Sequence, residues 1–135
     1  MISRAVERFL RSGNTCRIAT VGEDGYPHCV PVGYVYQAGL IYIATNSASR
    51  KVRNIRRNPK CCVLVDLERK RGAKGVMLRG CAEVLTGKAF SKLRSRVESI
   101  SGWHLDRWEL GPKPYDKVDA FVIFTPERLS TIGSV

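Results

Sequence analysis

The chain has 135 residues, of which 44% are hydrophobic and 26% charged, a composition typical of one globular domain spanning residues 1–135. Its 23 lysines and arginines exceed its 12 aspartates and glutamates by 11, and this excess favours an acidic ligand or partner. No apolar run reaches the roughly 18 residues that a transmembrane helix needs, and the charged first residues do not resemble a secretory signal. We therefore expect a cytoplasmic protein with no membrane partner.

The first predicted element is a short amphipathic helix that places Val6, Phe9 and Leu10 on one stripe. Ser3 is a typical N-cap for it, and Gly13 ends it. Three predicted strands follow, at residues 15–21, 28–36 and 40–45, and short turns such as the Asp-Gly turn before the second strand join them. Strands connected in this way predict an antiparallel sheet.

The next segment, residues 45–60, contains six cations and no acid. We predict a helix from about Ser49 to the Asn58-Pro59 step, with Val52 and Ile55 on its buried face. Half of the cations are expected to point towards solvent, namely Arg50, Arg53 and Arg57.

The rest of the chain adds strands at residues 61–67 and 75–85, with a charged loop at 68–74 between them. A second amphipathic helix ending at Gly102, an irregular segment at 103–119 and a closing strand at 120–133 complete the prediction; the helix carries Phe90, Leu93, Val97 and Ile100 on one face. About six strands in so short a chain must curl to bury both faces of the sheet. The predicted fold is therefore mainly β (α+β), a small six-stranded antiparallel barrel with flanking helices.

The start of the central basic helix has the composition of a phosphate site. Cations in the first turn of a helix are mildly unfavourable, by roughly 0.3–1 kcal/mol each, unless an anion binds there. Arg50 and Lys51 occupy this turn, and free helix N–H groups lie beside them. Short donors precede it, at Thr45, Asn46, Ser47 and Ser49. The pattern favours a phosphate site over the alternative, a capped helix with a solvated basic face.

The second strand contains Pro31 and Gly33, although its other residues are mostly apolar. Proline cannot donate to a ladder and glycine packs no side chain, so the pair indicates a bulge or an open edge. A flat ring with polar edges would fit there while its phosphate reaches the helix start. A simple edge strand is the alternative, and both His28 and His104 remain open between a ligand contact and a structural role.

Residues 17–66 carry a longer pattern, which reads R-x-A-T, then D-G-x-P-h, then T-x-x-x-S-R-K-x-x-N-h-x-x-N-P. This pattern resembles that of the FMN-binding split-barrel proteins, the pyridoxamine 5′-phosphate oxidase-like superfamily. The resemblance implies a homodimeric split barrel that binds FMN at the subunit interface. It also implies an oxidoreductase that moves hydride or electrons between FMN and an unidentified small substrate or electron donor.

By position, the resemblance assigns the ribityl phosphate to Ser49, Arg50 and Lys51, with Thr45 on the same side. It assigns the isoalloxazine ring to the second strand, at Cys29, Val30, Pro31 and Val32. Residues of the partner subunit would cover the ring, and the candidates for this cover are Trp103, Trp108 and the segment from Met77 to Arg79.

Other functions compete with an FMN-dependent oxidoreductase. The C-terminal Arg-x-His pattern of true pyridoxamine 5′-phosphate oxidases is missing from the sequence, so oxidation of pyridoxamine phosphate is not expected. Relatives of this length include F420- and haem-binding proteins, and a basic module that binds nucleic acid without enzymatic activity is a further, disfavoured alternative. No side chain stands out as catalytic. The five cysteines lack zinc-ligand spacing and are expected to be small thiols in strands, although disulfides stay open.

Overall fold

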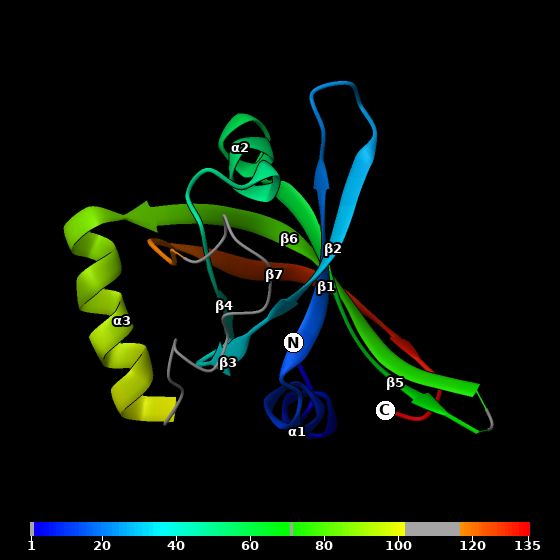
Figure 1. Cartoon of the computed structure of the whole chain (residues 1–135). Helices are drawn as coiled ribbons and strands as arrows, with labels where there is room; N and C mark the ends of the chain where they lie inside the picture. Colours follow the sequence, from blue (N-terminus) through cyan, green and yellow to red (C-terminus); the bar gives the residue numbers. More distant parts are fainter. Residues whose placement is uncertain (1, 71, 102–116) are drawn as a thin grey trace.

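The computed structural model describes residues 2–70, 72–101 and 117–135, and only the backbone at residues 100 and 101. Within these ranges the fold is mainly β, with three helices placed around one sheet (Figure 1). In chain order the elements are α1 (Arg4–Ser12), β1 (Thr15–Val21), β2 (Pro27–Gly33), β3 (Val35–Gln37), β4 (Leu40–Thr45), α2 (Arg50–Arg57), β5 (Lys60–Arg69), β6 (Gly72–Thr86), α3 (Gly87–Ser101) and β7 (Ala120–Ile132).

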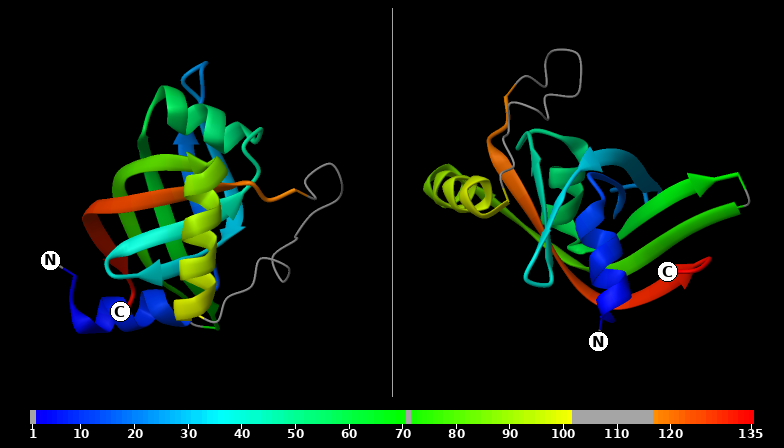
Figure 2. Two further views of the ribbon diagram at one scale, coloured as in Figure 1. Left: turned by 90° about the vertical axis from the view of Figure 1, so that its left-hand side faces the viewer. Right: turned by 90° about the horizontal axis from the view of Figure 1, so that it is seen from below.

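The strands form one antiparallel sheet in the order β2-β1-β5-β6-β7-β4-β3. This sheet curls into a half-barrel, which Figure 2 shows from the side and from below. The curl brings the edge strand β2 close to β4, although no ladder joins them. The antiparallel, curled sheet expected from the sequence is thus confirmed.

The sheet has seven strands in the described part of the chain, so the predicted number of six is wrong. The predicted strand at residues 28–36 is two strands, β2 and β3, which lie at opposite edges of the sheet. The chain crosses between these edges at Tyr34, whose backbone N–H donates to the Asn14 carbonyl at 3.0 Å. The Tyr34 side chain is buried and its hydroxyl donates to the Leu10 carbonyl of α1. An aromatic anchor therefore divides what the hydrophobic pattern presents as a single strand.

The predicted charged loop at residues 68–74 is also wrong. β5 and β6 continue as a paired ladder through Glu68↔Ala73 to Arg69↔Gly72, so the connection is a tight hairpin. These long strands extend past the barrel as the arm at the lower right of Figure 1. Cross-strand pairing in the arm satisfies backbone groups that a loop would leave to water.

Apolar side chains lie on both faces of the sheet. The larger cluster fills the concave side beneath α1 and α2, and it includes Leu10, Ile18, Val52 and Phe124. A smaller cluster packs α3 against the other face, where the Phe90 and Phe121 rings lie 5.0 Å apart between centroids. Burial on both faces explains the continuous apolar run at the start of β7.

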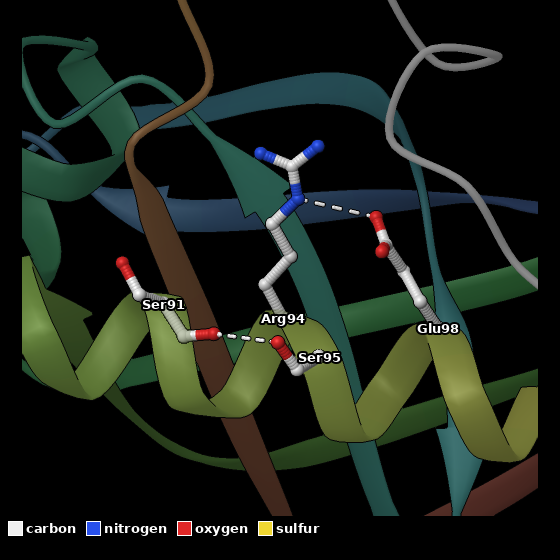
Figure 3. A network of polar contacts seen from close by, with 4 residues as sticks. All are labelled: Ser91, Arg94, Ser95 and Glu98. Atoms are coloured by element: carbon white, nitrogen blue, oxygen red, sulfur yellow. Dashed lines mark hydrogen bonds and ion pairs between the residues drawn. The ribbon is translucent and has the colours of Figure 1, made fainter.

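The first two helices, α1 and α2, confirm their predicted positions and ends. In α1 the Ser3 hydroxyl accepts a hydrogen bond from the Val6 N–H at 3.2 Å, the usual N-cap contact. α3 buries Phe90, Leu93 and Val97 as predicted, while the predicted end at Gly102 lies outside the described residues. Polar contacts also run along α3: Arg94 Nε donates to Glu98 Oε1 at 3.1 Å, and the Ser95 hydroxyl donates to the Ser91 carbonyl (Figure 3).

All five cysteines are free thiols, on strands β1, β2, β5 and β6. Within the described ranges, no group of three or more His, Cys, Asp or Glu side chains could hold a metal ion. Over the same ranges, no helix combines the length and the apolar character needed to cross a membrane.

Candidate functional site

A cavity of about 340 Å³ lies where the curled sheet is not closed by a ladder. β3 pairs only with residues 40–42 of β4, so Ala44 and Thr45 have no strand on that side and face β2 instead. The N-terminus of α2 lies at one end of this gap. The lining residues come from these three elements and from the approach to β7: His28, Val30, Pro31, Val32, Gly33, Ala44, Thr45, Asn46, Ser49, Arg50, Lys51 and Val118.

The N-cap of α2 is built differently from that of α1. Ser49 is the N-cap residue, but its hydroxyl makes no cap hydrogen bond to the backbone. The Ser49 side chain is only 7% exposed, and among the described residues its oxygen has no hydrogen-bond partner. A buried hydroxyl without a partner costs free energy, on the order of 1–3 kcal/mol. A ligand atom in the cavity would remove that cost.

The first turn of α2 favours a negative charge. It contains Arg50 and Lys51 and no acid, and the N–H groups of a first helical turn have no partners within the helix. Lys51 is half-buried, and this burial lowers the pKa of its ammonium group below the ordinary value. An anion bound here would therefore gain a desolvated cation, helix N–H groups and a free hydroxyl together.

The loop that leads into α2 is fastened to the start of β7. The Asp119 carboxylate accepts hydrogen bonds from the Ser47 N–H at 2.7 Å and from the Ser47 hydroxyl at 2.9 Å. In return, the Asp119 N–H donates to the Thr45 carbonyl at 3.1 Å. Asn46 adds a bond from its side-chain amide to the Lys117 carbonyl at 2.8 Å. These contacts hold the backbone that presents Ser49 to the cavity.

The opposite wall of the cavity is β2. Residues alternate along a strand, so His28, Val30 and Val32 point to the inner side while Cys29 points outward. Val30 and Val32 make this wall apolar, suited to the face of a flat ring. His28 Nδ1 is a buried atom for which the described residues offer no hydrogen-bond partner. Burial lowers the pKa of His28, and the charges of Arg50 and Lys51 lower it further.

The sequence profile described as pyridoxamine 5′-phosphate oxidase matches residues 2–133, nearly the whole chain. The chain belongs to this family. The similarity to the FMN-binding split-barrel superfamily that the sequence pattern indicates is thus confirmed. Among proteins with curated functions, no match was found.

Solved structures agree with the family assignment. A FAD-binding protein from Mesorhizobium loti is 28% identical with a TM-score of 0.74, over 97% of this chain and 94% of that one. An F420 reductase is 19% identical with a TM-score of 0.70, over 96% and 98% of the two chains. A heme-binding protein from Mycobacterium smegmatis is 19% identical with a TM-score of 0.68, over 98% of this chain but 55% of that one. The last two support the fold alone.

Most of the site residues that the family resemblance assigns line this one cavity. Those at the helix end and those on the strand wall face each other across it, namely Thr45, Ser49, Arg50, Lys51, Val30, Pro31 and Val32. Cys29 is exposed on the outer side of β2 and does not line the cavity. The structure thus brings the predicted residues together from three elements, while their contact with a cofactor stays a prediction.

The cover that residues of a partner subunit would give to the ring stays a prediction. Met77 to Arg79 belong to β6 and do not line this cavity, and Trp103 and Trp108 lie outside the described residues. Arg57 is exposed, as expected, and its guanidinium Nη2 also donates to the Val21 carbonyl of β1 at 3.0 Å.

Sequence reasoning missed the role of Asp119 in this family member. It lies 72 residues from its partner Ser47, and no local pattern marks an acid at the start of a strand as a loop anchor. Val118 also lines the cavity, and no local pattern in the sequence marks it as a site residue. Ala44 lies within a predicted strand but carries no polar group that would single it out.

Proposed function

We propose that the protein is an FMN-binding flavoprotein that acts as an oxidoreductase on a small substrate or electron donor. One observation carries the proposal: the buried Ser49 hydroxyl lacks a partner among the described residues, and Ser49 lines, with Arg50 and Lys51, a cavity whose far wall is apolar. This donor set fits a phosphate monoester, and the wall fits a ring. The 28% identical FAD-binding structure supports a flavin in this fold.

Each residue group has a distinct part in this proposal. The Ser49 hydroxyl donates a hydrogen bond to the phosphate, and Arg50 and Lys51 balance the negative charge of the phosphate. Val30 and Val32, which line the cavity, would exclude water from one ring face, and backbone groups near Pro31 and Gly33 would contact the ring edge. The isoalloxazine supplies hydride and single-electron transfer when bound, so the chain needs few catalytic side chains of its own.

In this proposal the protein is a homodimer and a second copy covers the flavin. The family resemblance supports this assembly. Sedimentation of the purified protein should give twice the 15.1 kDa of one chain, and a species of 15.1 kDa with flavin bound would contradict it.

The test begins with whatever small molecule copurifies. We expect a yellow protein whose released ligand has the absorption spectrum of a flavin and the mass of a flavin nucleotide, FMN or its dinucleotide FAD. Lys51→Ala should weaken FMN binding by about tenfold or more, because it removes a charge-assisted hydrogen bond worth roughly 1.5–3 kcal/mol. Riboflavin, which lacks the phosphate, should bind both proteins equally. Lys60→Ala is the matched control, since Lys60 is exposed and does not line the cavity.

The same experiment separates the alternatives. A released ligand with the spectrum and mass of F420 or haem would show that this ligand is bound instead of FMN. Solved structures of this fold include an F420 reductase and a heme-binding protein. A colourless protein that FMN does not stabilise against heat, but that binds an oligonucleotide with steep salt dependence, would instead favour the basic nucleic-acid module.

A further inference from the structure

A second cavity, of about 430 Å³, lies between α2 and the turn that joins β1 to β2. Figure 1 shows α2 beside this hairpin. Arg50 lines both cavities, so the second one adjoins the proposed phosphate site. Its lining residues are Gly22, Glu23, Asp24, Arg50, Arg53, Asn54 and Arg57.

Three arginines make one wall of the second cavity. Arg50, Arg53 and Arg57 are spaced three and four residues apart along α2, so they share one face of the helix. Across the described residues, none of the three forms an ion pair with a carboxylate within 4.0 Å. Arg57 is held in place by its bond to the Val21 carbonyl. Three unneutralised guanidinium groups on one wall form a site for a phosphate, which arginine can bind through two parallel hydrogen bonds.

The other wall is a well-bonded turn. The Gly22 N–H donates to the Tyr26 carbonyl at 2.8 Å, and the Gly25 N–H donates to the Gly22 carbonyl at 2.9 Å. Asp24 Oδ1 accepts from the Tyr26 N–H at 3.1 Å, so this carboxylate belongs to the turn. Glu23 is exposed and makes no such bond in the described structure. The acids on this wall repel an anion, so the anion would lie against the arginines.

We propose that this arginine cavity binds the second phosphate of a flavin dinucleotide whose first phosphate binds at Ser49 and Lys51. The proposal rests on the proposed flavin function and names a ligand class for it, a flavin with two phosphates. Adjacent phosphates of a dinucleotide share one bridging oxygen, so they require neighbouring subsites. Arg50 lies at the border of the two cavities, where it can bind both phosphates.

Isothermal titration with FMN, FAD and riboflavin tests the proposal. The wild-type protein should bind FAD more tightly than FMN, and added salt should reduce the difference. Arg53→Gln should weaken FAD binding by about tenfold and leave FMN binding unchanged, because Arg53 lines only the second cavity. Arg56→Gln is the matched control: it removes the same charge from the same helix, but Arg56 lines neither cavity.

A second variant should shift the affinity in the opposite direction. Glu23→Gln removes a negative charge from the facing wall, so FAD binding should tighten, by roughly threefold, with FMN binding unchanged. Opposite shifts from two exposed residues could not come from a folding defect.

The outcomes separate this inference from the proposed function. If the protein binds FMN but prefers FAD by no margin, or if Arg53→Gln and Arg56→Gln weaken FAD binding equally, the second subsite is refuted and the flavin function stands. Equal losses for FMN and FAD in Arg53→Gln would also refute it. If neither flavin binds the wild-type protein, the proposed function and the inference both fall.

Discussion

Two serines occupy helix N-caps, but their hydroxyl groups have different surroundings. The Ser3 hydroxyl accepts from the Val6 N–H and so stabilises α1. The Ser49 hydroxyl starts α2 but makes no cap bond, and it is buried without a partner among the described residues. The same residue type at the same helix position is therefore hydrogen-bonded in one helix and left without a cap bond in the other.

This difference predicts the effect of alanine at each cap. Ser3→Ala should lower the free energy of unfolding by about 1 kcal/mol, the usual cost of losing a cap. Ser49→Ala should cost less than half of that, because no cap bond is lost, yet it should weaken FMN binding. Urea unfolding and flavin titration of both variants measure the two effects. A loss of stability in Ser49→Ala as large as in Ser3→Ala would contradict the assigned role.

His28 should make the stability of the protein depend on pH. Burial and the neighbouring charges of Arg50 and Lys51 lower its pKa in the folded protein below the ordinary value of 6.5. Over the interval between the lowered pKa and 6.5, the unfolded chain binds more protons at this residue than the folded chain. The free energy of unfolding should therefore be highest near neutral pH. It should decrease as the pH falls from 6.5 towards the lowered pKa.

The comparison that isolates this contribution is His28→Gln, which keeps a polar side chain but cannot titrate. Between pH 7 and pH 5 the melting temperature of the wild-type protein should fall by more than that of the variant. The carboxylates titrate in both proteins, so their contribution cancels in the difference. Parallel pH curves for the two proteins would show that His28 is not responsible.

At the level of elements, the start of β7 determines the shape of the loop before α2. Asp119 accepts two hydrogen bonds from Ser47 and donates one to Thr45, so the loop is fixed by a strand that is distant in sequence. A carboxylate near a phosphate site is electrostatically unfavourable. Its presence there is explained by geometry, because it holds the loop in place.

Two substitutions at Asp119 separate geometry from charge. Asp119→Ala removes the acceptors and should weaken FMN binding by about tenfold, or about 1.4 kcal/mol, while riboflavin binding stays unchanged. Asp119→Asn keeps one carbonyl acceptor and removes the negative charge, so it should bind FMN at least as well as the wild-type protein. Titration of the three proteins with both flavins measures this. Equal weakening in both variants would contradict a positioning role.

At the level of the whole molecule, β6 and β7 approach each other closely near the middle of the sheet. Their register shifts between Arg79 and Gly80, which is a β-bulge or a comparable irregularity. A Cβ atom on Gly80 would lie 2.0 Å from the Thr125 carbonyl oxygen. Because that oxygen is backbone, only a shift of the strands could accommodate a side chain.

Gly80→Ala should therefore destabilise the fold by about 2 kcal/mol or more. Gly75→Ala in the same strand is the matched control, because its Cβ would lie 3.1 Å from the nearest backbone oxygen and needs only a small adjustment. Urea unfolding followed by circular dichroism compares the two variants. If they are equally stable, the close approach at Gly80 does not restrain the sheet.

Whether an element could be predicted depends on how far apart in the sequence its interacting residues lie. α1, β1, β4 and α2 match their predicted positions, because periodicity and end signals are local. The division of residues 28–36 into β2 and β3 could not be predicted, since it depends on the burial of Tyr34 under α1. The β5–β6 hairpin reads as a loop in sequence because its charged residues are stabilised by cross-strand pairing rather than by burial.

The sequence by itself determined the family pattern, the mainly β class and the cations at the start of α2, because each depends on residues that are close together in the sequence. Only the tertiary structure decided that α2 faces β2 across an open edge, that Asp119 holds the intervening loop and that Arg50 borders two cavities. These features join residues up to 72 positions apart. Their contacts exist only once the sheet has curled, and local sequence preferences carry no information about such distant partners.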